Sequence, residues 1–145
     1  MNLSNKDVDE IIENLIIHRT EINSLCGNIE RANKSYDFAI RKICEIIRDK
    51  KIDLLIALLK NQDAVIVYVM LLFLLPISQR KAYKKIIRFI FSSNKSFDFK
   101  TLLREYKSGR LKYPKLIGDC IVYVSKNEYL EQFTNEEVKL ISKVI

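Results

Sequence analysis

The sequence contains few residues that allow tight turns: among its 145 residues are three Gly and two Pro. A sandwich or barrel of many short strands needs such turns at regular intervals, and phosphate-binding loops need Gly-rich stretches. Both classes are therefore disfavoured. Apolar residues make up 48% of the chain, and its length suits one domain with a buried core. We expect a single domain spanning residues 1–145, built mainly from helices.

Cysteine and long apolar runs are also scarce. The three cysteines are odd in number, widely spaced and without a C-x-x-C pair, which argues against a disulfide framework or a zinc site. The longest apolar run, residues 64–77, has 14 residues and includes Pro76, fewer than the ~18 to 20 that span a bilayer. Residues 1–10 carry three acidic side chains, unlike the basic start of a signal peptide. We expect a cytoplasmic protein without membrane contact.

The first half of the chain shows helical periodicity. Apolar residues recur at spacings of three and four over residues 8–22 and 29–47, and Gly27 lies between the two patterns. These segments predict an antiparallel helical hairpin. A short apolar helix is expected over residues 52–59.

A helix over residues 64–75 is predicted to lie at the centre of the molecule. Asn61, Gln62 and Asp63 break the preceding apolar pattern and offer an N-cap, and Pro76 ends the helix. This segment has no polar stripe, so neighbouring elements must cover it on most sides.

Two amphipathic helices are predicted next, over residues 79–91 and 99–108. Polar and glycine residues mark their expected boundaries, namely Ser78, the cluster 92–94, Asp98 and Gly109.

Pro114 suits the first turn of a seventh helix, which we expect over residues 114–124. Two capping-box spacings follow, Ser125 with Glu128 and Thr134 with Glu137. They predict one short helix and a final helix that runs to residue 145.

Paired helices at a period of roughly 30 residues are typical of helical-hairpin repeats. Residues 52–75, 79–108 and 114–145 fit such pairs. A single hairpin cannot bury its own apolar face, but stacked hairpins share a core. The predicted fold is all-α, with about seven or eight helices in stacked antiparallel hairpins.

The turn Leu-Leu-Lys-Asn-Gln-Asp at residues 58–63, before an apolar second helix, resembles the inter-helix turn of HEAT-like repeats. The stretches at residues 74–78 and 103–111 look like those of small bacterial single-domain HEAT-like proteins. The resemblance covers about residues 36–112 and implies a HEAT-like α-α superhelix. Some proteins of this kind act as immunity proteins against toxins, which implies a protein-binding function.

Residues suited to catalysis are sparse. The one histidine, His18, lies within a helical pattern, and no motif places a nucleophile beside it. The acidic residues Asp7, Asp9, Glu10 and Glu13 fall in the first turns of a helix, where the helix dipole favours negative charge. We therefore predict no catalytic site, no metal site, no cofactor and no enzymatic activity.

The distribution of charge is the most informative feature. Residues 1–60 hold ten basic and ten acidic side chains, whereas residues 80–115 hold twelve Lys or Arg against two acidic residues, a sum of +10. At about 100° per residue, the basic side chains of each helix in this region gather on one side. The predicted partner-binding residues are Arg80, Lys84, Lys85, Arg88, Lys100, Arg104 and Lys107.

Several interpretations of this basic ridge, residues 80–115, are open. A solvated amphipathic face is one, although such faces normally mix both signs of charge. A field of one sign attracts an acidic partner, and the first hypothesis is a non-catalytic protein-binding module. Its most specific form is an immunity protein that neutralises a cognate bacterial toxin of the contact-dependent kind, for example a nuclease. Such a protein would meet an acidic surface of the toxin, or would bind through its own charge-balanced N-terminal hairpin.

The alternative is nucleic-acid binding through residues 80–115. An adaptor that binds some other protein is also compatible with the sequence. A membrane surface is a weaker option, because the core needs the apolar faces of the same helices.

Overall fold

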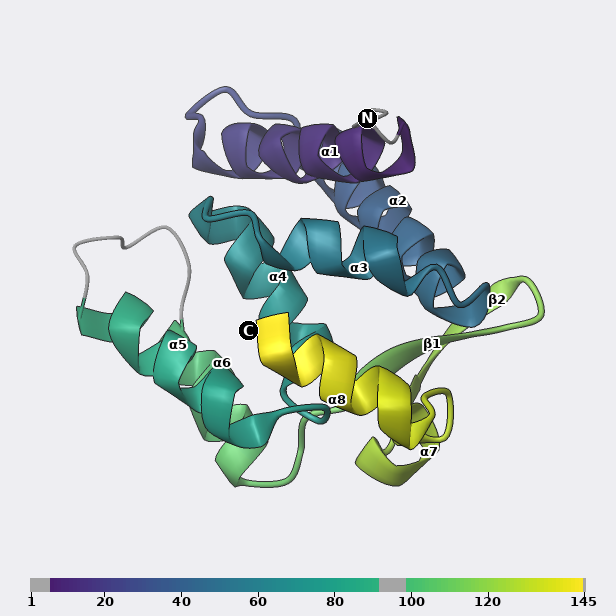
Figure 1. Cartoon of the computed structure of the whole chain (residues 1–145). Helices are drawn as coiled ribbons and strands as arrows, with labels where there is room; N and C mark the ends of the chain where they lie inside the picture. Colours follow the sequence, from purple (N-terminus) through teal and green to yellow (C-terminus); the bar gives the residue numbers. More distant parts are fainter. Residues whose placement is uncertain (1–5, 92–98, 145) are drawn as a thin grey trace.

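The computed structural model describes residues 6–91 and 99–144 and is mainly helical. Figure 1 shows the arrangement of its eight helices and one two-stranded sheet. In chain order the elements are α1 (Lys6–Asn23), α2 (Ile29–Arg48), α3 (Ile52–Leu59), α4 (Ala64–Leu74), α5 (Gln79–Phe91), α6 (Phe99–Lys107), β1 (Tyr113–Ile117), β2 (Cys120–Val124), α7 (Lys126–Leu130) and α8 (Asn135–Val144).

Helix α4 lies at the centre, as its apolar sequence predicts. Nine of its eleven residues are buried, and α1, α3, α5 and β1 all contact it (Figure 1). The Asp63 side chain accepts a hydrogen bond of 3.0 Å from the Val65 N–H, so the predicted N-cap is confirmed. The helix ends at Leu74, shortly before Pro76.

The predicted helices at the N-terminal end are also confirmed. Helices α1 and α2 pack against each other across the loop that contains Gly27. A hydrogen bond of 3.0 Å joins His18 Nδ1 and the Ala32 carbonyl, and an ion pair of 2.7 Å joins Arg19 to Asp63. Arg19 therefore fastens α1 to the N-cap of the central helix.

The helix predicted over residues 114–124 is wrong, because this segment forms the antiparallel hairpin of β1 and β2. Ile117 pairs with Cys120, which leaves a two-residue turn in which Gly118 has a φ of 62°. A glycine with positive φ at the first turn position suits a type II′ hairpin turn, whose twist matches that of the strands.

Pro114 is compatible with this hairpin. In an antiparallel pair, hydrogen-bonded and non-hydrogen-bonded residue pairs alternate, starting from the hydrogen-bonded pair beside a two-residue turn. The register places Pro114 opposite Tyr123, three pairs from Ile117–Cys120 and thus at a non-hydrogen-bonded position. The absence of an N–H group at Pro114 therefore removes no hydrogen bond between the two strands. The prediction of an all-α fold is correct for most of the chain but misses this sheet.

The C-terminal caps are confirmed. Ser125 Oγ accepts from the Glu128 N–H at 3.3 Å, and Thr134 and Glu137 exchange two hydrogen bonds of 2.8 and 3.1 Å. Tyr129 of α7 is fully buried, and its hydroxyl donates to the Phe73 carbonyl at 2.7 Å. This bond ties the C-terminal part of the chain to α4.

The boundaries of α5 and α6 agree with the sequence to within one residue, and Gly109 has a φ of 76° beyond the end of α6. The predicted helix end at residues 92–94 and the predicted cap Asp98 lie outside the described residues. Within the described ranges, no helix is both long and apolar enough to cross a membrane.

Candidate functional site: the basic surface of α5 and α6

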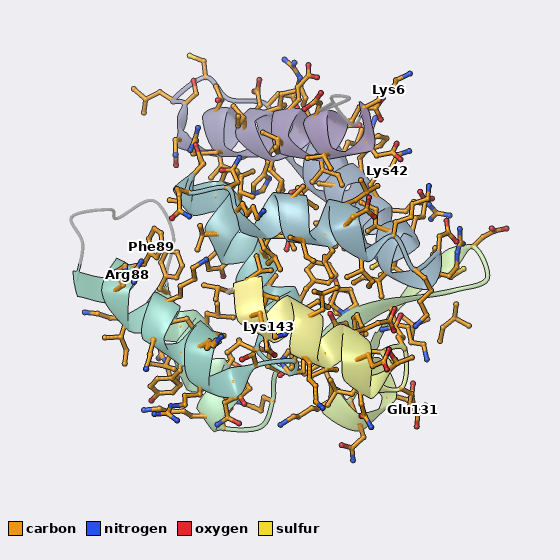
Figure 2. All side chains as sticks on the ribbon, viewed as in Figure 1. Lys6, Lys42, Arg88, Phe89, Glu131 and Lys143 are labelled. Atoms are coloured by element: carbon orange, nitrogen blue, oxygen red, sulfur yellow. The ribbon has the colours of Figure 1, made fainter. Side chains whose placement is uncertain are left out.

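Aromatic contacts hold α5 and α6 together and against the centre of the molecule. The Phe89 ring stacks on Phe99 with centroids 5.0 Å apart, and Phe99 meets Tyr68 of α4 edge-on at 5.3 Å. Ala82 and Ile86 of α5 are fully buried. Figure 2 shows Phe89 and Arg88 on α5, on the opposite side of the view from the β-hairpin. With the apolar sides fixed in this way, the remaining sides of both helices face solvent.

The solvent side of this hairpin carries basic residues from both helices. At about 100° per residue, the exposed cations of each helix lie away from its buried residues. Lys107 of α6 joins the two sets, because its Nζ lies 5.4 Å from the centre of the Tyr83 ring on α5. We define the basic face as six exposed residues, Arg80, Lys84, Arg88, Lys100, Arg104 and Lys107.

Lys85, the seventh predicted residue, lies apart from the basic face. It is half-buried and lines a small space with Leu58, Asn61 and Leu74 from the α3–α4 region. Burial, and then the charge of Arg88, lower the pKa of the Lys85 ammonium. The side of α5 that carries Lys85 therefore packs toward the core.

Few carboxylates accompany these cations. Elsewhere the basic side chains often have acidic partners, as in the pairs Arg19–Asp63, Arg31–Glu21 and Lys50–Glu137. Between described residues 79 and 115, Glu105 is the only acidic residue, and its ion pair of 3.4 Å is with Arg110. The positive charge of the basic face is therefore left largely uncompensated by this part of the chain.

The surface of α6 offers shape as well as charge. A shallow groove of about 470 Å³ is lined by Lys100, Leu103, Arg104, Lys107 and Ser108. On α5, Ile87 is 38% exposed among the cations. A partner that fits this surface would place acidic groups against the cations and apolar atoms against Leu103 and Ile87.

A deeper hollow lies beside the basic face, where the chain passes from α6 to β1. It measures about 560 Å³, and its lining includes Tyr83, Lys107, Lys112, Tyr113 and Lys126. Lys112 belongs to the charge excess of residues 80–115, but Lys126 lies in the net acidic C-terminal part. The β-hairpin between these two lysines brings them to the same hollow. The spacing of residues in the sequence therefore does not predict that they lie together.

Two other polar residues with a possible chemical role, His18 and Asp7, have structural contacts. The His18 ring lies 5.0 Å from that of Tyr36, in addition to its hydrogen bond with Ala32. Asp7 forms an ion pair of 3.8 Å with Lys42 of α2. Over residues 6–91 and 99–144, no three His, Cys, Asp or Glu side chains come together in a group that could hold a metal ion.

In comparisons with known proteins, no family model, no curated protein and no solved structure matches the chain.

Proposed function

We propose that this chain acts by binding another macromolecule through the basic face, and that its partner is a protein with an acidic surface. The observation that carries the proposal is the single-sign charge on two packed helices. Six exposed cations lie on the two packed helices α5 and α6, and Glu105, the one acidic residue described between residues 79 and 115, is engaged by Arg110. A single-sign field accelerates association with a partner of opposite charge and helps to exclude like-charged proteins.

The groove on α6 supports a protein partner in particular. Leu103 and Ile87 provide apolar contact area among Lys and Arg side chains whose stems add to it. Protein interfaces combine an apolar centre with Arg residues and a charged rim. Arg80, Arg88 and Arg104 are the basic-face residues best suited to bidentate contacts with partner carboxylates.

A more specific proposal is an immunity protein that neutralises a cognate bacterial toxin. This proposal rests on the resemblance of residues 36–112 to HEAT-like proteins. It also rests on the fact that a protein can inhibit a toxin with a complementary surface alone, without catalytic residues of its own. The order of the helices, α3 with α4 and α5 with α6, is compatible with stacked HEAT-like hairpins. A HEAT-like architecture is therefore part of the same proposal. Under it, the toxin meets the basic face with an acidic surface.

Nucleic acid is the second candidate, because the same six cations would also suit phosphates. Binding that depends on several phosphate contacts weakens steeply with salt, by about 10³-fold or more between 50 and 200 mM for six contacts. A protein interface with an apolar centre depends less on salt. Salt dependence therefore separates the two candidates.

The test is a pull-down with the tagged chain from a lysate of its own organism, at about 50 and about 300 mM salt, with and without nuclease. Our proposal predicts that one polypeptide is retained at the higher salt and that nuclease does not release it. Recovery of nucleic acid that disappears at the higher salt would contradict protein binding and favour the second candidate. Inhibition of an enzymatic activity of the retained polypeptide would support the immunity proposal.

A further inference from the structure

The hollow beside the basic face has the size of a small-molecule site. Its volume of about 560 Å³ falls within the ~300 to 1,000 Å³ typical of ligand pockets. Four segments form its walls: the start of α5, the end of α6 with the following loop, the start of β1, and the start of α7. Gly109, with its φ of 76°, reverses the chain after α6 and so creates one wall.

The polar lining carries charge of one sign. Three lysines contribute to it, Lys107, Lys112 and Lys126, and none of the described lining residues is Asp or Glu. Uncharged polar groups are present as well, in the side chains of Gln79 and Ser125. Lysine ammonium groups bind phosphate as compact charges with three donors each. A lining of this kind selects an anion.

Most of the remaining lining is aromatic, and Leu111 completes it. Three tyrosines, Tyr83, Tyr106 and Tyr113, contribute to it from three different elements. Tyr113 is only 3% exposed, and burial raises its pKa to about 12. Burial also raises the pKa of Tyr106. Because both hydroxyls stay neutral at physiological pH, these rings do not oppose a bound anion. The partly exposed rings of Tyr83 and Tyr106 offer contacts to a flat group, and the buried Tyr113 ring supports the wall behind them.

We propose that this hollow is a binding site for a nucleoside monophosphate. The phosphate lies among the ammonium groups of Lys107, Lys112 and Lys126, and the base packs against the tyrosine rings. Neither half of such a ligand uses the whole lining alone. Inorganic phosphate leaves the aromatic side empty, and a nucleoside leaves the lysines without an anion.

This proposal does not depend on the proposed protein partner. Lys112 and Lys126 line the hollow but are not part of the basic face, whereas Arg80, Lys84 and Arg88 belong to the basic face and do not line the hollow. Substitutions in one set therefore leave the other set intact.

The test is calorimetric titration of the purified chain with the four 5′-ribonucleoside monophosphates, and with adenosine and inorganic phosphate as half-ligands. We expect at least one nucleotide to bind, with Kd at least about tenfold below that of either half-ligand. The double variant Lys112→Gln/Lys126→Gln should weaken binding by about tenfold or more, since hydrogen bonds to charged groups are lost. The matched control Lys51→Gln/Lys139→Gln removes two exposed lysines outside the hollow and should leave Kd unchanged.

Three results would overturn the proposal: no binding of any nucleotide, binding no tighter than that of inorganic phosphate, or equal affinities of the two double variants. Lys112 and Lys126 are exposed, so their substitution opens no cavity in the core. Thermal unfolding of both variants verifies that they are folded. Chemical-shift changes that centre on the residues lining the hollow, the three tyrosines and the three lysines among them, would place the bound nucleotide there.

Discussion

Removal of one buried hydroxyl, in the substitution Tyr129→Phe, tests how the C-terminal part of the chain is held to α4. The Tyr129 hydroxyl donates to the Phe73 carbonyl at 2.7 Å, and the side chain is fully buried. If the helix continued, the Ile77 N–H would donate to the Phe73 carbonyl. In this structure the Ile77 N–H donates instead to the Leu74 carbonyl, at 2.9 Å. Pro76 interrupts the regular ladder in this region. The hydroxyl therefore completes the end of the helix.

The expected cost follows from what the substitution leaves behind. The ring keeps its packing against Tyr113 and Phe133, whose centroids are 5.5 and 5.6 Å away. The loss is one hydrogen bond, and the Phe73 carbonyl remains buried without that donor, at a cost of about 1 to 3 kcal/mol. We expect the free energy of unfolding to fall by about 2 kcal/mol. At about 2 to 4 °C per kcal/mol for a chain of this size, Tm falls by about 4 to 8 °C.

Urea unfolding followed by circular dichroism measures this change. Tyr123→Phe is the matched control, because the same atom is removed from a side chain that is 58% exposed. The control should change stability by less than about 0.5 kcal/mol. Equal stabilities of the two variants would refute the role that we assign to the Tyr129 hydroxyl.

Three further predictions concern other elements. Gly109→Ala should cost about 1 kcal/mol, measured by urea unfolding, because a φ of 76° strains any residue with a Cβ, although no neighbour lies within 4 Å of that atom. The Thr134 N–H, and then Lys50, hold the pKa of Glu137 below its ordinary 4.5. Its contribution to stability is therefore complete above that value and lost as the pH falls below it, so Glu137→Gln should flatten the acid limb of a stability–pH profile. Burial raises the pKa of Cys44 to about 12, whereas Cys26 and Cys120 are exposed. Iodoacetamide should label only the exposed pair in the folded protein, as read by mass spectrometry, and labelling of Cys44 at the same rate would contradict its burial.

The helical part of the fold follows from local patterns. The all-apolar segment of α4 has to be surrounded, and Asp63 marks its start, so sequence alone predicts both its position and its cap. The capping boxes at Ser125 and Thr134 are equally local, because each joins residues three positions apart.

The hairpin of β1 and β2 shows where local reasoning fails. Pro114 suits the first turn of a helix, but it also suits a non-hydrogen-bonded strand position, and only the strand register decides between the two. The pair Gly118 and Asp119 is typical of a two-residue hairpin turn, and this signal predicts the strands better than Pro114 predicts a helix. A Gly-Asp pair between two short apolar segments, the second of them rich in β-branched residues, predicts a hairpin.

The candidate site was predictable only in part. Helical spacing correctly separates Arg80, Lys84 and Arg88 from the buried side of α5. The same spacing does not show which side of the basic arc packs against a neighbouring helix. Helical spacing alone therefore groups Lys85 with the exposed basic residues. The hollow depends on contacts between four segments, so no periodicity of one segment reveals it.

The central claim is that the basic face carries the partner interaction, and charge reversal on that face tests it most directly. The variant replaces four residues with Glu, namely Arg80, Lys84, Arg88 and Arg104. Its control makes the same change in net charge on exposed lysines elsewhere, namely Lys6, Lys51, Lys60 and Lys139. In pull-downs at about 300 mM salt, we predict that the control retains the polypeptide captured by the unmodified chain and that the basic-face variant loses it. Equal retention by both variants, each folded by circular dichroism, would contradict the claim.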